Sequence, residues 1–137
     1  KNVFAFFCLG SVLYIFISLV SYSSLDPSLS SISSLSGSIE NLGGPFGAYL
    51  SDALFSVIGI GAYLFLLVMS FVAVKQLFFY EPSDNTHKVI KVTSALVLLS
   101  SFSALCEFYY SGDYFPQSSS GGLVGALIFT SLSNIFG

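Results

Sequence analysis

Residues 43–59 read GGPFGAYLSDALFSVIG, and residues 121–137 read GGLVGALIFTSLSNIFG. The two stretches align without a gap, and self-similarity of this kind indicates duplicated structural units. The repeat therefore predicts an all-α protein built from two related halves. The glycines that match are Gly43, Gly44, Gly47 and Gly59 in the first copy and Gly121, Gly122, Gly125 and Gly137 in the second.

Each copy has the pattern of an amphipathic helix, predicted at 45–58 and at 122–136. At 100° per residue, apolar side chains form one stripe and polar side chains, including Asp52, form the opposite face. Such a helix suits the plane of a membrane interface, with its polar face in water. The two stripes are Phe46, Leu50, Leu54 and Val57, and Val124, Ile128, Leu132 and Ile135.

The glycines at the start of each copy have two interpretations. A Gly-Gly pair permits a sharp turn into a helix, and Pro45 suits a first helical position. Gly43 and Gly47, like Gly121 and Gly125, also have GxxxG spacing, which lets a second backbone approach closely. The sequence leaves open whether these glycines, with Gly44 and Gly122, serve the turn alone or both the turn and helix packing.

Apolar segments surround the repeats on both sides. A helix rises about 1.5 Å per residue, so about 20 apolar residues cross a hydrocarbon core of roughly 30 Å. The apolar run 44–79 is too long for one span, and Gly59 and Gly61 are expected to break it. The predicted order is a span at 3–21, an outer loop at 22–43, the helix at 45–58, a span at 60–79, a cytoplasmic turn at 80–88, a span at 89–109, an outer loop at 110–121 and the helix at 122–136.

Composition supports an integral membrane protein. Of 137 residues, 54% are hydrophobic and only 8% are charged, whereas soluble domains carry about a quarter charged residues. A net charge of −3 argues against direct binding of nucleic acid. Since a span follows the first repeat copy, the repeat also predicts a fourth transmembrane helix after Gly137.

Charge is distributed unequally between the two predicted sides. All lysines lie at the N-terminus or in the 75–91 region, and the positive-inside rule assigns that side to the cytoplasm. The chain is then expected to start in the cytoplasm, with both serine- and glycine-rich loops outside. The lysines are Lys1, Lys75, Lys88 and Lys91, and the acidic residues predicted outside are Asp26, Glu40, Asp52 and Asp113.

No catalytic, cofactor-binding or metal-binding constellation is visible in the sequence, so we expect no enzyme activity of this segment. His87 is expected in the solvated cytoplasmic turn, without the partners that a metal site needs. Asp26, followed by Pro27, is expected to shape a turn. Asp52 is expected on the wet face of its helix, and both carboxylates are possible contacts for a partner.

Three stretches resemble one known family. Residues 21–28 (SYSSLDPS), 41–52 (NLGGPFGAYLSD) and 121–129 (GGLVGALIF) resemble, in order, segments of the N-terminal four-helix membrane domain of the FtsK/SpoIIIE DNA translocases. Ser24 stands where the family pattern has proline. The resemblance covers essentially the whole chain.

The resemblance implies a membrane anchor and division-site interaction module, which acts in chromosome segregation and cell division. Such a domain lies in the bacterial inner membrane at the septum, and contacts the lipid bilayer and other division proteins. It tethers a hexameric ATPase, so a homo-oligomer is implied, with ATP and Mg in the parent motor. This chain has no GxxxxGK[ST] pattern, so the motor lies outside it.

Two other classes of function agree with parts of the sequence. Paired repeats with glycine-broken helices also occur in transporters, which makes a subunit of a small channel or transporter the alternative. Transport usually needs ionisable groups within the spans, and the middles of these spans have none. An extracytoplasmic sensor is the third possibility, but the outer loops are short for a ligand domain.

Overall fold

The computed structural model describes residues 2–26, 39–78, 85–110 and 119–136, and this part of the chain is helical without strands. The predicted all-α class is confirmed. The predicted outer loops and cytoplasmic turn lie partly outside the described residues. The helices are α1 (Asn2–Val20), α2 (Gly44–Ile58), α3 (Gly61–Phe78), α4 (Asn85–Tyr109) and α5 (Gly122–Phe136).

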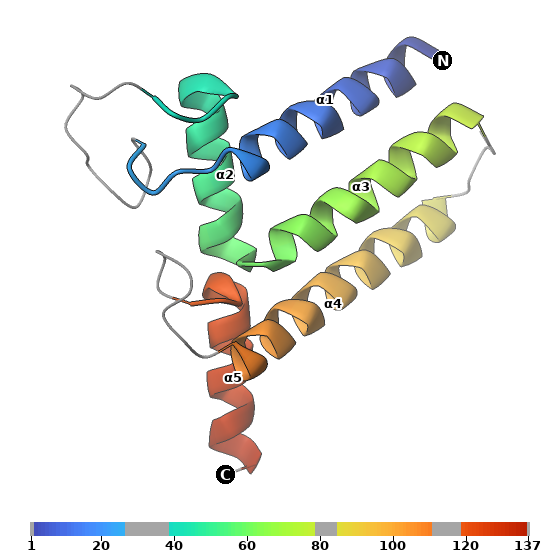
Figure 1. Ribbon diagram of the computed structural model, residues 1–137. Coiled ribbons are helices and arrows are strands. Elements are labelled where there is room, and N and C mark those ends of the chain that lie inside the picture. The colour runs from blue at the N-terminus through green and yellow to red at the C-terminus, as the bar shows by residue number, and fades with distance from the viewer. Residues whose placement is uncertain (1, 27–38, 79–84, 111–118, 137) are drawn as a thin grey trace.

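The helices form two groups that run in different directions (Figure 1). Helices α1, α3 and α4 lie side by side, with α3 between the other two. Helices α2 and α5 run across one end of this group, and the end of α2 meets the start of α5. The chain therefore has one layer of three roughly parallel helices. Helices α2 and α5 form a second layer, which runs at an angle to the first.

Two helices are long and apolar enough to cross a membrane. They are α3, over Gly61–Phe78, and α4, over Thr86–Tyr109. The apolar helical stretch Phe6–Val20 of α1 is shorter. By length and composition, α3 and α4 thus meet the requirement that a hydrocarbon core sets.

The start of α4 corrects one predicted boundary. Residues 80–88 were expected as a turn and the span from 89, but α4 already begins at Asn85. His87 and Lys88 consequently lie in a helix, where both are exposed. The reason is local: Pro82 is the last helix breaker before the apolar run, so the polar residues after it can extend the helix by a turn.

Glycines determine where α2 and α5 begin. Gly44 and Gly122, the first residues of α2 and α5, have φ angles of 68° and 63°, which favour glycine because it lacks a Cβ. Gly44 N–H donates to Asn41 O at 2.9 Å, and Gly122 N–H donates to Ser119 O at 3.2 Å. The two helices thus begin with the same backbone turn.

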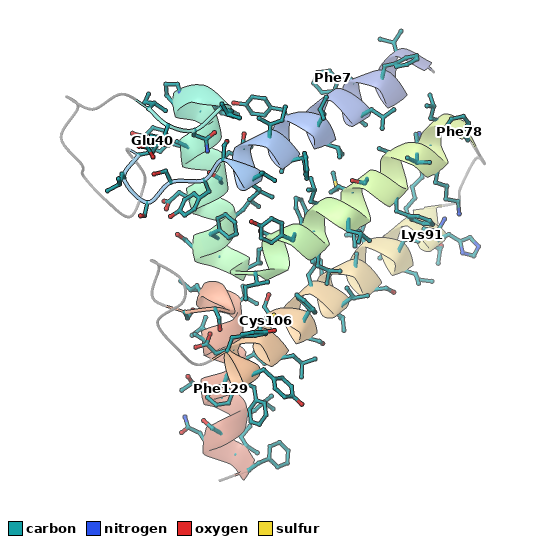
Figure 2. All side chains as sticks on the ribbon, in the orientation of Figure 1. Phe7, Glu40, Phe78, Lys91, Cys106 and Phe129 are labelled. Atoms are coloured by element: carbon teal, nitrogen blue, oxygen red, sulfur yellow. The ribbon has the colours of Figure 1, made fainter. Side chains whose placement is uncertain are left out.

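The apolar core is small. Leu19, Phe55, Ala62 and Leu66 form a buried cluster between α1, α2 and α3. Many large apolar side chains point outward instead, along every helix (Figure 2). Several buried positions are polar or charged: Ser18, Asp26, Asn41, Ser51, Asp52, Ser103 and Ser120.

Candidate functional site

The buried polar residues gather at two places, where α1 meets α2 and where α4 meets α5. We call the first the α1–α2 polar junction; it comprises Ser18, Asp26, Asn41, Ser51 and Asp52, all buried. Each is held by hydrogen bonds, as buried polar groups generally are. This junction includes both carboxylates that the sequence singled out.

Asp26 binds backbone on the far side of the first loop. Its Oδ1 accepts the Glu40 N–H and its Oδ2 accepts the Asn41 N–H, each at 2.8 Å. The side chain is 2% exposed. The carboxylate therefore joins the chain just after α1 to the chain just before α2, which is a larger role than the local turn expected from the sequence.

Asn41 continues the network into both helices. Its Nδ2 donates to Ser18 O at 2.9 Å and to Ser51 Oγ at 3.4 Å. Its Oδ1 accepts the Gly43 N–H at 2.8 Å. Asn41 thus links the last turn of α1, the middle of α2 and the turn that starts α2.

The expected position of Asp52 on a wet helix face is wrong, because Asp52 is 0% exposed. Tyr22 donates its hydroxyl to Asp52 Oδ1 at 3.4 Å. The pKa of Tyr22 is raised, first by burial and then by the Asp52 charge and hydrogen bond. A helical wheel separates two faces but does not say which one packs inward, and here the polar face of α2 does.

The α4–α5 polar junction comprises Ser103, Glu107 and Ser120. Glu107 Oε2 accepts the Gly121 N–H at 2.9 Å, and Ser120 Oγ donates to Cys106 O at 3.0 Å. A carboxylate again binds backbone beyond a loop, as Asp26 does. Glu107 and Gly121 lie 14 positions apart, so no local sequence pattern shows this pairing.

The two GxxxG pairs face serines on the neighbouring helices. A Cβ on Gly47 would lie 2.7 Å from Ser18 Oγ, and a Cβ on Gly125 would lie 2.5 Å from Ser103 O. Gly43 and Gly121 contact the same serines, Ser18 and Ser103 respectively. The space beside these glycines is therefore filled by the adjacent helix, which is the geometry of close helix packing.

The two halves meet at a joint between the end of α2 and the start of α5. Ile60 N–H donates to Ser120 O at 2.9 Å, and Ser103 Oγ donates to Ile58 O at 3.1 Å. Gly59 has a φ of 57°, and a Cβ on it would meet the backbone of Ser120 and Gly122. Glycine is thus required there by conformation and by space.

The chemistry of these junctions is structural. In residues 2–26, 39–78, 85–110 and 119–136 no group of three His, Cys, Asp or Glu side chains could hold a metal ion. His87 is exposed on the first turn of α4. The carboxylates and serines bind backbone groups and thereby hold the helix ends in position.

Comparison with known proteins identifies the family. Residues 1–137 match the family profile described as the 4TM region of DNA translocase FtsK/SpoIIIE. DNA translocase FtsK 1 of Neisseria meningitidis serogroup B is 31% identical over 124 residues, which cover 85% of this chain and 15% of that protein. FtsK of Vibrio vulnificus is 29% identical over 120 residues, covering 84% of this chain and 12% of that protein.

A third relative, FtsK of Pseudomonas putida, is 30% identical over 117 residues, which cover 82% of this chain and 14% of that protein. The chain thus spans between 12% and 15% of the length of these curated relatives. No solved structure matches the chain.

The match confirms the resemblance that the three sequence stretches indicated, and it extends over the whole chain. It covers the 4TM region and not the motor, so neither enzyme activity nor a cofactor is expected of this segment. The chain belongs to the family of the 4TM region of the FtsK/SpoIIIE DNA translocases.

Proposed function

We propose that this chain is the membrane anchor and division-site interaction module of a DNA translocase that acts in chromosome segregation and cell division. One observation carries the proposal beyond the family match: large apolar side chains point outward while Asp26, Asn41, Ser51 and Asp52 are buried. Water would select the reverse distribution, whereas lipid accepts apolar surface and requires polar groups to be satisfied internally.

In this proposal α1, α3 and α4 cross the bacterial inner membrane, and α2 and α5 lie at its outer interface. The crossing direction of α2 and α5 supports the interfacial assignment (Figure 1). The matched start of the two helices supports an origin by duplication, because Gly44 and Gly122 share an unusual φ. The same duplication calls for a fourth span after α5, as α3 follows α2.

The proposed orientation puts the N-terminus in the cytoplasm. Lys75 lies in the last turn of α3, and Lys88 and Lys91 lie near the start of α4. Glu40 lies at the opposite end of the three-helix layer from Lys91 (Figure 2). Lysines flanking short connections favour the cytoplasmic side, which supports this assignment.

Partners in this proposal are the lipid bilayer, other division proteins and further copies of the chain. A hexamer follows from the motor that the family carries, and ATP, Mg and DNA belong to that motor. Asp26 and Asp52 are both buried, so we infer that they hold the outer surface in shape for a partner and do not touch the partner themselves.

Two measurements test the anchor. Cells expressing residues 1–137 fused to a fluorescent protein are extracted with alkaline carbonate and imaged during division. We expect the fusion to stay in the membrane pellet and to concentrate at the septum. Release into the supernatant would exclude the anchor, and uniform membrane fluorescence would exclude division-site targeting.

The orientation is tested by single cysteines at Glu40 and His87, both exposed in the structure. Glu40→Cys is expected to react with a membrane-impermeant maleimide in intact cells, and His87→Cys only after the cells are opened. The opposite result would reverse the topology. A specific solute flux through liposomes that contain the protein would favour the channel or transporter alternative.

A further inference from the structure

The charged residues divide into two groups of opposite sign along the chain. The residues that precede α1, end α3, connect α3 to α4 and begin α4 carry four lysines against two carboxylates, a balance of +2. The rest of the chain carries five carboxylates and neither lysine nor arginine, a balance of −5. The first group is Lys1, Lys75, Lys88, Lys91, Glu81 and Asp84, and the second is Asp26, Glu40, Asp52, Glu107 and Asp113.

The structure brings three of the lysines to one end of the three-helix layer. Lys75 lies in the last turn of α3, and Lys88 and Lys91 lie in the first two turns of α4. The two helices are neighbours, and Figure 2 shows Lys91 at the same end of the layer as Phe78 of α3. Lys88 and Lys91 share one face of α4 because they are three residues apart. All three lysine side chains are exposed.

The surface around these lysines is apolar. Residues 86–94 of α4 are all exposed, and the hydroxyls among them bind their own helix. Thr93 Oγ1 donates to Val89 O at 3.0 Å, and Ser94 Oγ donates to Ile90 O at 2.7 Å. The lysine ammonium groups, by contrast, need acceptors from outside the helix. The exposed apolar side chains near the lysines in sequence are Phe71, Val74 and Phe78 on α3, and Val89, Ile90 and Val92 on α4.

Cations set in an apolar surface match the chemistry of an anionic phospholipid. A lysine stem lies along apolar surface while its ammonium group stays at the level of the headgroups. A phospholipid then supplies a phosphate to the ammonium and acyl chains to the apolar side chains. DNA would supply the phosphates alone and leave Phe78 and Val89 in water. Clustered cations on the cytoplasmic side of a membrane attract anionic lipids.

We propose that Lys75, Lys88 and Lys91 bind the phosphates of anionic phospholipids in the cytoplasmic leaflet, with the acyl chains against the apolar side chains beside them. The inference rests on the membrane anchor and the orientation proposed above. It adds a preference for one class of lipid, which the contact of an anchor with a bilayer does not require. Glu81 and Asp84 lie outside the described residues, so the experiment removes their charges in a separate variant.

Spin-labelled lipids test the site on the full-length protein in phosphatidylcholine vesicles. Nitroxide-labelled phosphatidylglycerol and phosphatidylcholine are added in turn, and electron paramagnetic resonance measures the fraction of each that the protein immobilises. We expect phosphatidylglycerol to associate about tenfold more strongly, which corresponds to about 1.4 kcal/mol. High salt should reduce this preference. Both leaflets contain the labelled lipid, so the orientation of a variant in the vesicle does not affect the measurement.

Substitutions assign the preference to the lysines. Lys91→Gln is expected to lower it about threefold, and Lys75→Gln, Lys88→Gln and Lys91→Gln together should abolish it. The same three positions changed to arginine should retain it, because the charge is kept. His87→Gln is the matched control: His87 is exposed on the same helix turn and is neutral at about pH 8, so the preference should not change.

The outcomes separate this site from the anchor itself. Equal association of the two lipids with the parent protein would reject the lipid site and leave the anchor intact, whereas no immobilised lipid of either kind would reject the anchor. A preference that appears only in Glu81→Gln with Asp84→Asn would mean that the lysines pair with those carboxylates. Release of immobilised phosphatidylglycerol by a short DNA duplex would assign the lysines to DNA. Either result would overturn the inference.

Discussion

At the scale of single residues, two carboxylates are buried and each is satisfied differently. Asp26 accepts two backbone N–H groups, from Glu40 and Asn41. Asp52 is bound by the Tyr22 hydroxyl. A buried ionised group without such partners would be very unfavourable. These hydrogen bonds therefore determine where the chain between α1 and α2 is held.

Replacing Asp26 by asparagine should destabilise the fold. Asparagine keeps one acceptor oxygen of two and loses the charge, so one buried N–H of Glu40 or Asn41 is left weakly bound. The free energy of unfolding in detergent is expected to fall by about 1–3 kcal/mol. Glu40→Gln is the control: the Glu40 side chain is exposed and accepts the Ser23 hydroxyl at 2.9 Å, so the substitution should cost less than about 0.5 kcal/mol. Equal losses would contradict the assigned role of Asp26.

The raised pKa of Tyr22 predicts that the protein becomes less stable at alkaline pH. Burial, followed by the Asp52 charge and hydrogen bond, raises its pKa above 10.0. Because the folded pKa exceeds the unfolded one, the stability that Tyr22 provides is complete below about pH 10 and is lost as pH rises through the folded pKa. The free energy of unfolding, measured from pH 8 to pH 12, should thus fall less for Tyr22→Phe than for the parent chain. An unchanged profile for Tyr22→Phe would refute the coupling.

At the scale of elements, the helices approach one another through glycine. Gly47 on α2 faces Ser18, and Gly61 on α3 lies where a Cβ would be 2.8 Å from Ser103 Oγ on α4. The helix contacts therefore depend on missing side chains as much as on the small apolar core. A methyl group added at either glycine would therefore have to displace the facing serine side chain or the helix that carries it.

Gly47→Ala and Gly10→Ala separate packing from helix propensity. Both positions lie in helices, but a Cβ on Gly47 would be 2.7 Å from Ser18 Oγ and from Asn41 Oδ1, while nothing lies within 4 Å of one on Gly10. Thermal unfolding in detergent should show Gly47→Ala destabilised by about 1–3 kcal/mol. Gly10→Ala should be neutral or stabilised by up to about 1 kcal/mol. A stable Gly47→Ala variant would show that α1 and α2 do not pack as described.

Helix positions could largely be predicted from the sequence, whereas the packing could not. A glycine interrupts a helix at its own position, so the break between α2 and α3 near Gly59 can be predicted from the neighbouring residues. The inward orientation of Asp52 depends on a partner helix that a helical wheel does not contain. The bonds from Asp26 to Asn41 and from Glu107 to Gly121 join residues 15 and 14 positions apart, across loops whose paths no local pattern determines.

At the scale of the whole molecule, charge lies at the two ends of the helical layer. Lys75, Lys88 and Lys91 are at one end, and Asp26, Glu40 and Asp52 are in the segments around α2 at the other. The long stretches between contain apolar and small polar residues. This separation is the basis of the proposed orientation, because lysines near span ends direct topology more strongly than acidic residues do.

Removing the lysines should disturb the orientation. In the triple variant Lys75→Gln, Lys88→Gln and Lys91→Gln, a fraction of the molecules is expected to insert the other way round. Labelling of a Glu40→Cys reporter in intact cells would then fall, and labelling of a His87→Cys reporter would appear.

Glu107→Gln is the control for a change of charge at the opposite end. Because acidic residues contribute little to topology, its labelling pattern should equal that of the parent. Retention of the parent pattern by the triple lysine variant would show that other features set the orientation.

The core cluster has a consequence for the order of synthesis. Leu19, Phe55, Ala62 and Leu66 all belong to α1, α2 and α3, so this cluster is complete once the chain through Phe78 has left the ribosome. Domains generally fold from the N-terminus as they are made. A nascent three-helix unit can therefore form before α4 emerges, and Gly59 and Gly61 then offer a finished surface against which the second half assembles.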